Sequence, residues 1–167
     1  FKASVVSITH ATCKGAQTGK VTFKMENLGG AGYRITEVNG ALRSGAGYTT
    51  EITAPTFEVD GLRPGVNTIK FSNRTCGIVR TVTITEPNAL TLTATISEPA
   101  MCSNNTKARV TLTAGGGTPP YTYIYQVGSN VTTQTSNVFT GVAPGTPTFR
   151  VVDKNGCSTQ LTGTFTV

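Results

Sequence analysis

The chain has 167 residues, and its 14 Lys and Arg residues outnumber its 8 Asp and Glu residues. Charged residues make up only 13% of the chain, against about 25% in an ordinary soluble domain. So low a charge content excludes a coiled coil and a chain kept disordered by its charge. There is no tryptophan and a single histidine, His10, which excludes any chemistry that needs two histidines. The length has room for one or two small domains.

Alternation of apolar and polar residues predicts β-strands along much of the chain. There are 32 threonines, and in several stretches a threonine alternates with an apolar residue, which is typical of a strand with one buried and one exposed face. No helical periodicity persists for more than about a turn. In chain order, the predicted strands cover residues 4–11, 20–25, 67–71, 80–85, 91–96, 108–113, 121–125, 148–152 and 160–167.

The two halves of the chain carry the same landmarks in the same order. Each half has a first cysteine, a strand, a glycine cluster that ends in a tyrosine, a Pro-Gly turn, and a second cysteine before a closing strand. The first half is longer between its glycine cluster and its Pro-Gly turn, and the glycine-rich stretch 39–47 accounts for the extra residues. We expect this stretch to form a lengthened surface loop or an extra hairpin.

These landmarks predict two tandem repeats, residues 1–87 and 88–167. Pro87 marks the joint, because a proline interrupts a strand ladder. About seven short strands per repeat, separated by turns, are the pattern of an Ig-like β-sandwich. The predicted fold class is therefore all-β, with two tandem Ig-like sandwiches. So short a link predicts limited bending between repeats, as in a stalk.

Four widely spaced cysteines predict disulfides rather than a metal site, because none lies in the Cys-x-x-Cys pair that zinc and redox sites use. With two repeats, the natural pairing is Cys13–Cys76 and Cys102–Cys157, one bridge in each. Each bridge would stabilise its repeat by about 4 kcal/mol on the chain-entropy model. Disulfides also indicate an oxidising, extracytoplasmic compartment. The alternative is four buried, reduced thiols.

The basic residues are scattered singly, mostly before residue 100, and form no recognisable nucleic-acid-binding motif. We therefore predict no nucleic-acid partner, although a weak affinity for anionic polysaccharide stays open. No stretch approaches the roughly 20 apolar residues of a membrane helix, so no membrane insertion is predicted. The N-terminus lacks the sections of a signal peptide and an initiating Met. We interpret the chain as a mature or excised piece of a larger protein.

Arg43 and Tyr48, in and beside the glycine-rich stretch, are the candidate ligand-binding residues. An exposed aromatic ring can stack on a sugar, and Tyr48 is a better candidate than Tyr33 or the tyrosines of residues 121–125. The latter lie on one face of a predicted strand, where packing in the core is the more common role.

Metal, cofactor and catalytic sites are not predicted. His10 has no partner histidine or nearby cysteine pattern, and no Gly-x-Ser-x-Gly turn presents a nucleophilic serine. Asp153 lies in the one Asp/Asn turn that a calcium ion could use. We expect it instead to form an Asx-type turn, with Gly156 at a positive φ. The glycine runs do not cradle phosphate, because no helix follows them.

Three motifs of the second half resemble the SprB repeat, a family named after a gliding-motility adhesin of Bacteroidetes. They are Gly-Gly-Gly-Thr-Pro-Pro-Tyr-Thr-Tyr at residues 115–123, Gly-Val-Ala-Pro-Gly at 141–145 and Val-Asp-Lys-Asn-Gly-Cys at 152–157. The joint at residues 85–92 looks like the usual join between such repeats. The first half matches more loosely, without the Pro-Tyr-x-Tyr run and the Asp before the second cysteine. Both halves lack the family's tyrosine in the strand after the Pro-Gly turn.

The resemblance implies a cell-surface, outer-membrane-associated filament that the type IX secretion system exports and that serves gliding and adhesion. In that picture the repeats form a structural stalk, their partners are neighbouring repeats of the same chain, and no catalytic residues are expected. The alternatives are a polysaccharide-binding module that uses residues 39–48, or an accessory domain of a secreted enzyme.

Overall fold

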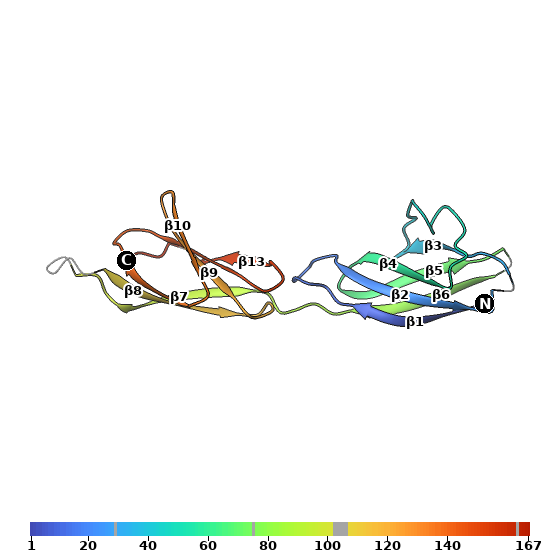
Figure 1. The fold of residues 1–167 in the computed structure, drawn as a ribbon, viewed down its shortest axis with the longest axis horizontal. Helices are drawn as coiled ribbons and strands as arrows, with labels where there is room; N and C mark the ends of the chain where they lie inside the picture. Colours follow the sequence, from blue (N-terminus) through green and yellow to red (C-terminus); the bar gives the residue numbers. More distant parts are fainter. Residues whose placement is uncertain (29, 75, 102–106, 163) are drawn as a thin grey trace. The chain divides into compact units, whose positions relative to one another are not determined.

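The computed structural model describes residues 1–28, 30–74, 76–101, 107–162 and 164–167. The chain divides into two compact units, Phe1–Glu86 and Pro87–Val167, and strands are the regular elements of both (Figure 1). None of the described residues is helical, and none belongs to a helix that could cross a membrane. The predicted all-β fold class is confirmed.

Unit 1 is a sandwich of two antiparallel sheets. One has the order β1-β2-β4 and the other the order β3-β5-β6. In an Ig sandwich, strands A, B and E form one sheet and strands C, F and G the other. The six strands of unit 1, taken as A, B, C, E, F and G, follow that rule. Their bounds are β1 (Lys2–Thr9), β2 (Gly19–Glu26), β3 (Arg34–Val38), β4 (Thr56–Leu62), β5 (Gly65–Ser72) and β6 (Gly77–Ile84).

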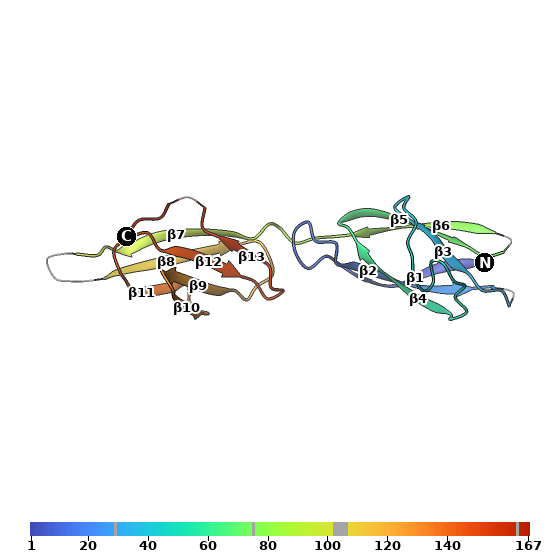
Figure 2. The ribbon, with the colours of Figure 1, turned by 90° about the horizontal axis from the view of Figure 1, so that it is seen from above.

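Unit 2 repeats this topology and adds one strand. Its sheets have the orders β11-β8-β7 and β10-β9-β12-β13, and the turned view shows the strands of each unit layered over one another (Figure 2). The extra strand, β10, pairs with β9 as a hairpin. The bounds are β7 (Thr91–Glu98), β8 (Ala108–Gly115), β9 (Thr122–Val127), β10 (Asn130–Gln134), β11 (Val138–Val142), β12 (Thr148–Val152) and β13 (Ser158–Gln160).

The core of unit 1 follows from the alternation along its strands. In β2, Val21, Phe23 and Met25 are buried while the residues between them face outward. Phe23 meets Phe71 of the opposite sheet edge-on, with 4.9 Å between ring centroids. Tyr33 is fully buried, its hydroxyl donates to the Ala54 carbonyl, and burial raises its pKa. Tyr33 is therefore a core residue and no candidate for sugar stacking.

The core of unit 2 is built around Phe149 of β12. Tyr125 of β9 stacks on Phe149 with 5.5 Å between ring centroids, and Tyr121 meets Tyr123 edge-on. Tyr123 is buried, and burial raises its pKa, with Tyr121 adding to the effect. The face of tyrosines packs against the core, as the sequence predicts.

Three strand predictions need correction. β1 ends at Thr9, so His10 lies beyond it, and its Nδ1 accepts a hydrogen bond from the Thr85 amide at 3.0 Å. Val5, Val6 and Ile8 of β1 are exposed despite the alternation, and the register of β1 against β2 shifts between Val5 and Ser7. The closing strand ends at Gln160 instead of running to residue 167. Beyond Gln160, Leu161 donates to the Phe149 carbonyl and Val167 pairs with Gly145, which are separate contacts rather than a ladder.

The position of the missing family tyrosine is filled differently in the two units. By alignment of the Pro-Gly turns, Asn67 stands there in unit 1 and Pro147 in unit 2, and both are buried. The Asn67 amide donates to the carbonyls of Arg63 and Gly65 at 2.7 and 3.0 Å. Its oxygen accepts from Asn39 at 2.8 Å. The side chain of Asn67 therefore provides hydrogen bonds to the carbonyls of the turn that precedes β5. Its own polar atoms are also paired, as buried polar groups in proteins are.

Candidate functional site

The candidate ligand residues lie in the connection between β3 and β4, where unit 2 instead has the β9–β10 hairpin. Val38 and Ala41 bridge each other across a tight turn, in which Asn39 has a φ of 54°. The Asn39 oxygen accepts from the Thr68 amide of β5 at 2.8 Å. At the other end, Ile52 bridges to Tyr33. The glycine-rich stretch is a lengthened loop, one of the two predicted forms, and both of its ends are fixed to the sandwich.

Within this loop the structure brings Arg43 and Tyr48 together. The Arg43 guanidinium carbon lies 5.9 Å from the centroid of the Tyr48 ring, which is a cation–π distance. Its Nη1 donates to the Asp60 carbonyl at 2.7 Å, and the Asp60 carboxylate is 3.7 Å away. Tyr48 in turn leans edge-on against Phe57. Both side chains are held in place before any ligand arrives.

Arg43 and Tyr48 line a pocket of about 370 Å³, within the size range of small-ligand sites. Leu42 beside them is 82% exposed. Among the described residues, Arg34 of β3 makes no ion pair and no acidic side chain lines the pocket. The wall combines two cations with apolar and hydroxyl groups. The full lining is Arg34, Thr36, Leu42, Arg43, Tyr48 and Thr49.

This lining suits a sugar that carries an acidic group. A guanidinium binds a carboxylate or sulfate with charge-assisted hydrogen bonds, the apolar wall can pack against a sugar ring, and threonine hydroxyls serve as donors or acceptors. Arg34 was not predicted from the sequence, because it lies on β3, the strand that leads into the loop, and not in the glycine-rich stretch itself. No pattern within the loop could have found it, since its place in the pocket depends on how β3 packs.

A smaller hollow of about 140 Å³ lies on the outer face of β9 and β12 in unit 2. Arg150 stands at its centre, opposite Ile124 on one side and Gln160 on the other. None of the described residues that line it is aromatic, and it is smaller than the pocket of unit 1. It is therefore the weaker candidate.

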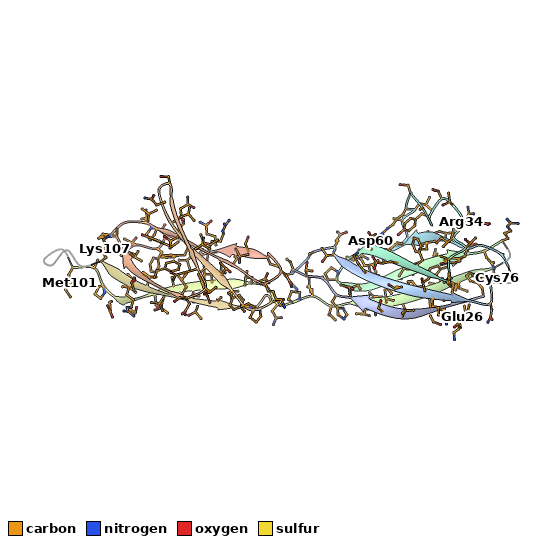
Figure 3. The ribbon with its side chains drawn as sticks, in the orientation of Figure 1. Glu26, Arg34, Asp60, Cys76, Met101 and Lys107 are labelled. Carbon is orange, nitrogen blue, oxygen red and sulfur yellow. The ribbon has the colours of Figure 1, made fainter. Side chains whose placement is uncertain are left out.

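The predicted disulfide Cys13–Cys76 is wrong, because Cys76 is free and exposed whereas Cys13 is disulfide-bonded. The strand order explains why. Residues next to Cys13 contact Glu86, beyond the end of β6, whereas Cys76 directly precedes the start of β6. The eight residues of β6 separate these ends by about 25 Å, while bridged cysteines need Cα atoms within about 7 Å. Figure 3 shows Cys76 at the end of unit 1 that also carries Arg34 and Glu26.

Cys157 in unit 2 is disulfide-bonded. The predicted bridge Cys102–Cys157 cannot be compared with the structure, because Cys102 lies outside the described residues. The alternative of four buried, reduced thiols is wrong, since two of the cysteines are bonded and one is exposed.

The turn around Asp153 has the predicted Asx geometry. One carboxylate oxygen accepts from the amides of Asn155 and Cys157, each at 2.9 Å, and Gly156 has a φ of 83°. The other oxygen accepts from the Thr118 amide at 2.8 Å. Both oxygens of this buried carboxylate are thus used by backbone amides. No group of three metal-binding side chains occurs among the residues that the structure describes.

The glycine run of unit 2 meets this turn. Gly116 has a φ of 68° and lies against Ala89, where a side chain would collide with the carbonyl oxygen. Gly117 donates to the Asn88 carbonyl at 2.9 Å, and a Cβ on it would lie 2.8 Å from the Asp153 carboxylate. Two of the three motifs that resemble the SprB repeat, residues 115–123 and 152–157, therefore meet at one end of unit 2 and hold that end together.

Comparison with known proteins supports the resemblance of unit 2 to the SprB repeat. The SprB repeat family matches residues 94–127, from β7 to the end of β9, which confirms the resemblance. No curated protein sequence matches the chain. Among solved structures, the C-terminal 282-residue fragment of intimin, in complex with the intimin-binding domain of the translocated intimin receptor, is similar with 15% identity and a TM-score of 0.44. That similarity covers 98% of this chain and 63% of the intimin fragment.

Proposed function

We propose that this chain is a pair of structural repeats from a long cell-surface adhesin. The observation that carries the proposal is the SprB match at residues 94–127. It is supported by the sandwich topology that both units share, and by the roles of Gly116, Gly117 and Asp153 in one end of unit 2. The function is not enzymatic: the repeats project a binding region away from the cell, and their partners are neighbouring repeats of the same protein.

The finer proposal is that the parent protein is exported by type IX secretion, remains associated with the outer membrane and serves gliding motility. It rests on the resemblance of the motifs at residues 115–123 and 152–157 to the SprB repeat. Disulfides at Cys13 and Cys157 suit such an extracellular place, because bonded cysteines persist in oxidising compartments.

Antibody fragments raised against residues 1–167 test this location. We expect them to label intact cells that carry the parent protein, and to lose that label when type IX secretion is disabled. An antibody against a cytoplasmic protein serves as the control and should label only permeabilised cells. Labelling of the repeats only after permeabilisation would refute a surface role.

A second candidate function, binding of an acidic polysaccharide, is favoured by the pocket of unit 1. Its specific support is the pair Arg43 and Tyr48 with the neighbouring Arg34, which provides two cations and an aromatic ring in a pocket whose described lining has no acidic side chain. A uronate-containing chain fits this chemistry better than a neutral one, because the Arg34 guanidinium, which makes no ion pair among the described residues, would have an anion to bind.

Binding to an array of acidic and neutral glycans measures this function. Arg34→Ala or Tyr48→Ala is expected to lower affinity for acidic glycans about tenfold, as the loss of one charged or aromatic contact does. Arg109→Ala removes the same charge from unit 2, away from the pocket, and should leave binding unchanged. Equal losses in the Arg34 and Arg109 variants would mean that net charge alone attracts the glycan.

A further inference from the structure

Each unit has a turn between its last two strands that ends in a cysteine. In unit 1 the Asn73 amide donates to the Cys76 carbonyl at 2.9 Å, and the Asn73 side-chain oxygen accepts from the Cys76 amide at 2.7 Å. In unit 2 the Asp153 amide donates to the Cys157 carbonyl, and the Asp153 carboxylate accepts from the Cys157 amide, both at 2.9 Å. Cys76 and Cys157 are therefore structurally equivalent residues.

The two equivalent cysteines differ in their chemical state. Cys157 is disulfide-bonded, whereas Cys76 is free and exposed. Corresponding turns thus end in a disulfide-bonded cysteine in unit 2 and in a free cysteine in unit 1. The bonded state of Cys157 indicates that a cysteine at this position of the turn can form a disulfide.

Cys76 lies at the end of unit 1 where the chain begins. β6 starts directly after it, and Arg80 of β6 donates to the Ala3 carbonyl of β1 at 2.7 Å. The same end holds the start of β1, at Lys2. Any segment that precedes residue 1 in a longer protein therefore enters unit 1 within reach of Cys76, whereas Cys13 lies at the opposite end and is already bonded.

We propose that Cys76 forms a disulfide with a cysteine of the repeat that precedes residue 1 in the parent protein. The inference rests on the proposed function, since it requires a tandem array. The two thiols pass two electrons and two protons to the disulfide of a thiol–disulfide oxidoreductase, which leaves as a dithiol while the new Sγ–Sγ bond forms. The repeats are then joined by side chains as well as by the backbone.

Alkylation before and after reduction, read by peptide mass spectrometry, tests the proposal. In residues 1–167, Cys76 should be alkylated without reduction, while Cys13 and Cys157 should react only after it. In a longer protein that includes the preceding repeat, Cys76 should be protected, and a non-reduced digest should contain a peptide that joins it to a cysteine of that repeat.

Cys76→Ser in the longer protein provides the matched control. Because the turn is held by backbone atoms and Asn73, the variant should keep the circular dichroism spectrum of the parent while one cysteine of the preceding repeat becomes reactive. Alkylation of Cys76 to the same extent in both lengths of protein would overturn the proposal. A disulfide-linked dimer of the longer protein that Cys76→Ser abolishes would overturn it too, since the partner would then be a second copy.

The outcome is separable from that of the proposed function. If the antibody fragments label the cell surface but Cys76 stays reactive in the longer protein, the adhesin function stands and the disulfide proposal fails. If Cys76 is bonded to the preceding repeat but the repeats stay inside the cell, the array is correct and the surface function fails.

Discussion

Asp153 is the residue on which the turn of unit 2 depends. The residue is 6% exposed, and its carboxylate accepts hydrogen bonds from the amides of Thr118, Asn155 and Cys157. Removal of the carboxylate leaves buried donors unsatisfied, which costs more than the bonds themselves contribute.

Asp153→Ala is therefore expected to lower the free energy of unfolding of unit 2 by about 3 kcal/mol, measured by urea denaturation. Asp153→Asn retains one acceptor oxygen and should lose less. Because the acceptors are already used by amides, addition of EDTA should leave the thermal midpoint unchanged. A drop in that midpoint with EDTA would show that a metal ion stabilises the turn.

Glu86 contributes a pH-dependent contact within unit 1. Lys14 donates a hydrogen bond to its carboxylate, and the Gly15 amide donates another at 2.6 Å. The Lys14 contact, followed by the Gly15 amide, lowers the pKa of Glu86 below its ordinary value of 4.5. The contact therefore stabilises the folded state above that pH and is lost as the pH falls through the lowered pKa.

Glu86→Gln should lower the thermal midpoint of unit 1 at pH 7 by a small, measurable amount, and the difference from the parent protein should shrink as the pH falls through the lowered pKa of Glu86. Thermal unfolding followed by circular dichroism over a series of decreasing pH values tests this. Glu98→Gln removes a carboxylate from an exposed ion pair of unit 2 and is the control. A difference for Glu86→Gln that stays constant as the pH is lowered would exclude the charged contact as its cause.

At the scale of elements, β2 and β8 show how far alternation predicts structure. In both strands the predicted inward residues are buried, because each is the central strand of its sheet and packs against the opposite one. In β1 the same alternation fails to predict burial, and the strand's register against β2 shifts between Val5 and Ser7. Alternation reports the two faces of a strand but not what covers each face.

The glycine run before β9 is an element whose sequence is dictated by close packing. Gly116→Ala combines a left-handed backbone with a collision against Ala89. Gly128 in the β9–β10 turn also has a positive φ, 56°, but a Cβ at this position would have no neighbouring atom within 4 Å. The two glycines therefore separate the cost of conformation from the cost of contact.

Gly128→Ala should lower the free energy of unfolding by about 1 kcal/mol, the cost of the left-handed conformation. Gly116→Ala should lower it by about 3 kcal/mol or more, because the backbone must also shift. Urea denaturation of both variants measures the difference. Equal losses would show that Gly116 is needed only for its φ.

At the scale of the whole molecule, each unit has its own hydrophobic core. The core of unit 1 is centred on Phe23 and Phe71, and that of unit 2 on Phe149. Every sheet is confined to one unit. A cavity in one core therefore removes contacts from that unit alone.

Phe23→Ala is expected to cost unit 1 about 3–5 kcal/mol. Hydrogen exchange should then speed up in β2 and β5 of unit 1, while β8 and β12 of unit 2 keep their protection. Phe23→Leu, which retains most of the buried volume, should have a much smaller effect. A comparable loss of protection in β8 would show that the units unfold together.

The sequence by itself determined the two central strands β2 and β8, the two repeats, the tyrosine packing and the Asx turn at Asp153, because each depends on residues close together in the chain. Only the tertiary structure decided the state of Cys76, the part of Arg34 in the pocket and the role of Asn67. All three depend on which residues the packing of the strands brings together, and local sequence patterns do not contain that information. The low charge content and the many threonines reflect the two faces of the strands. Exposed faces carry threonines, and buried faces carry the apolar residues of the core.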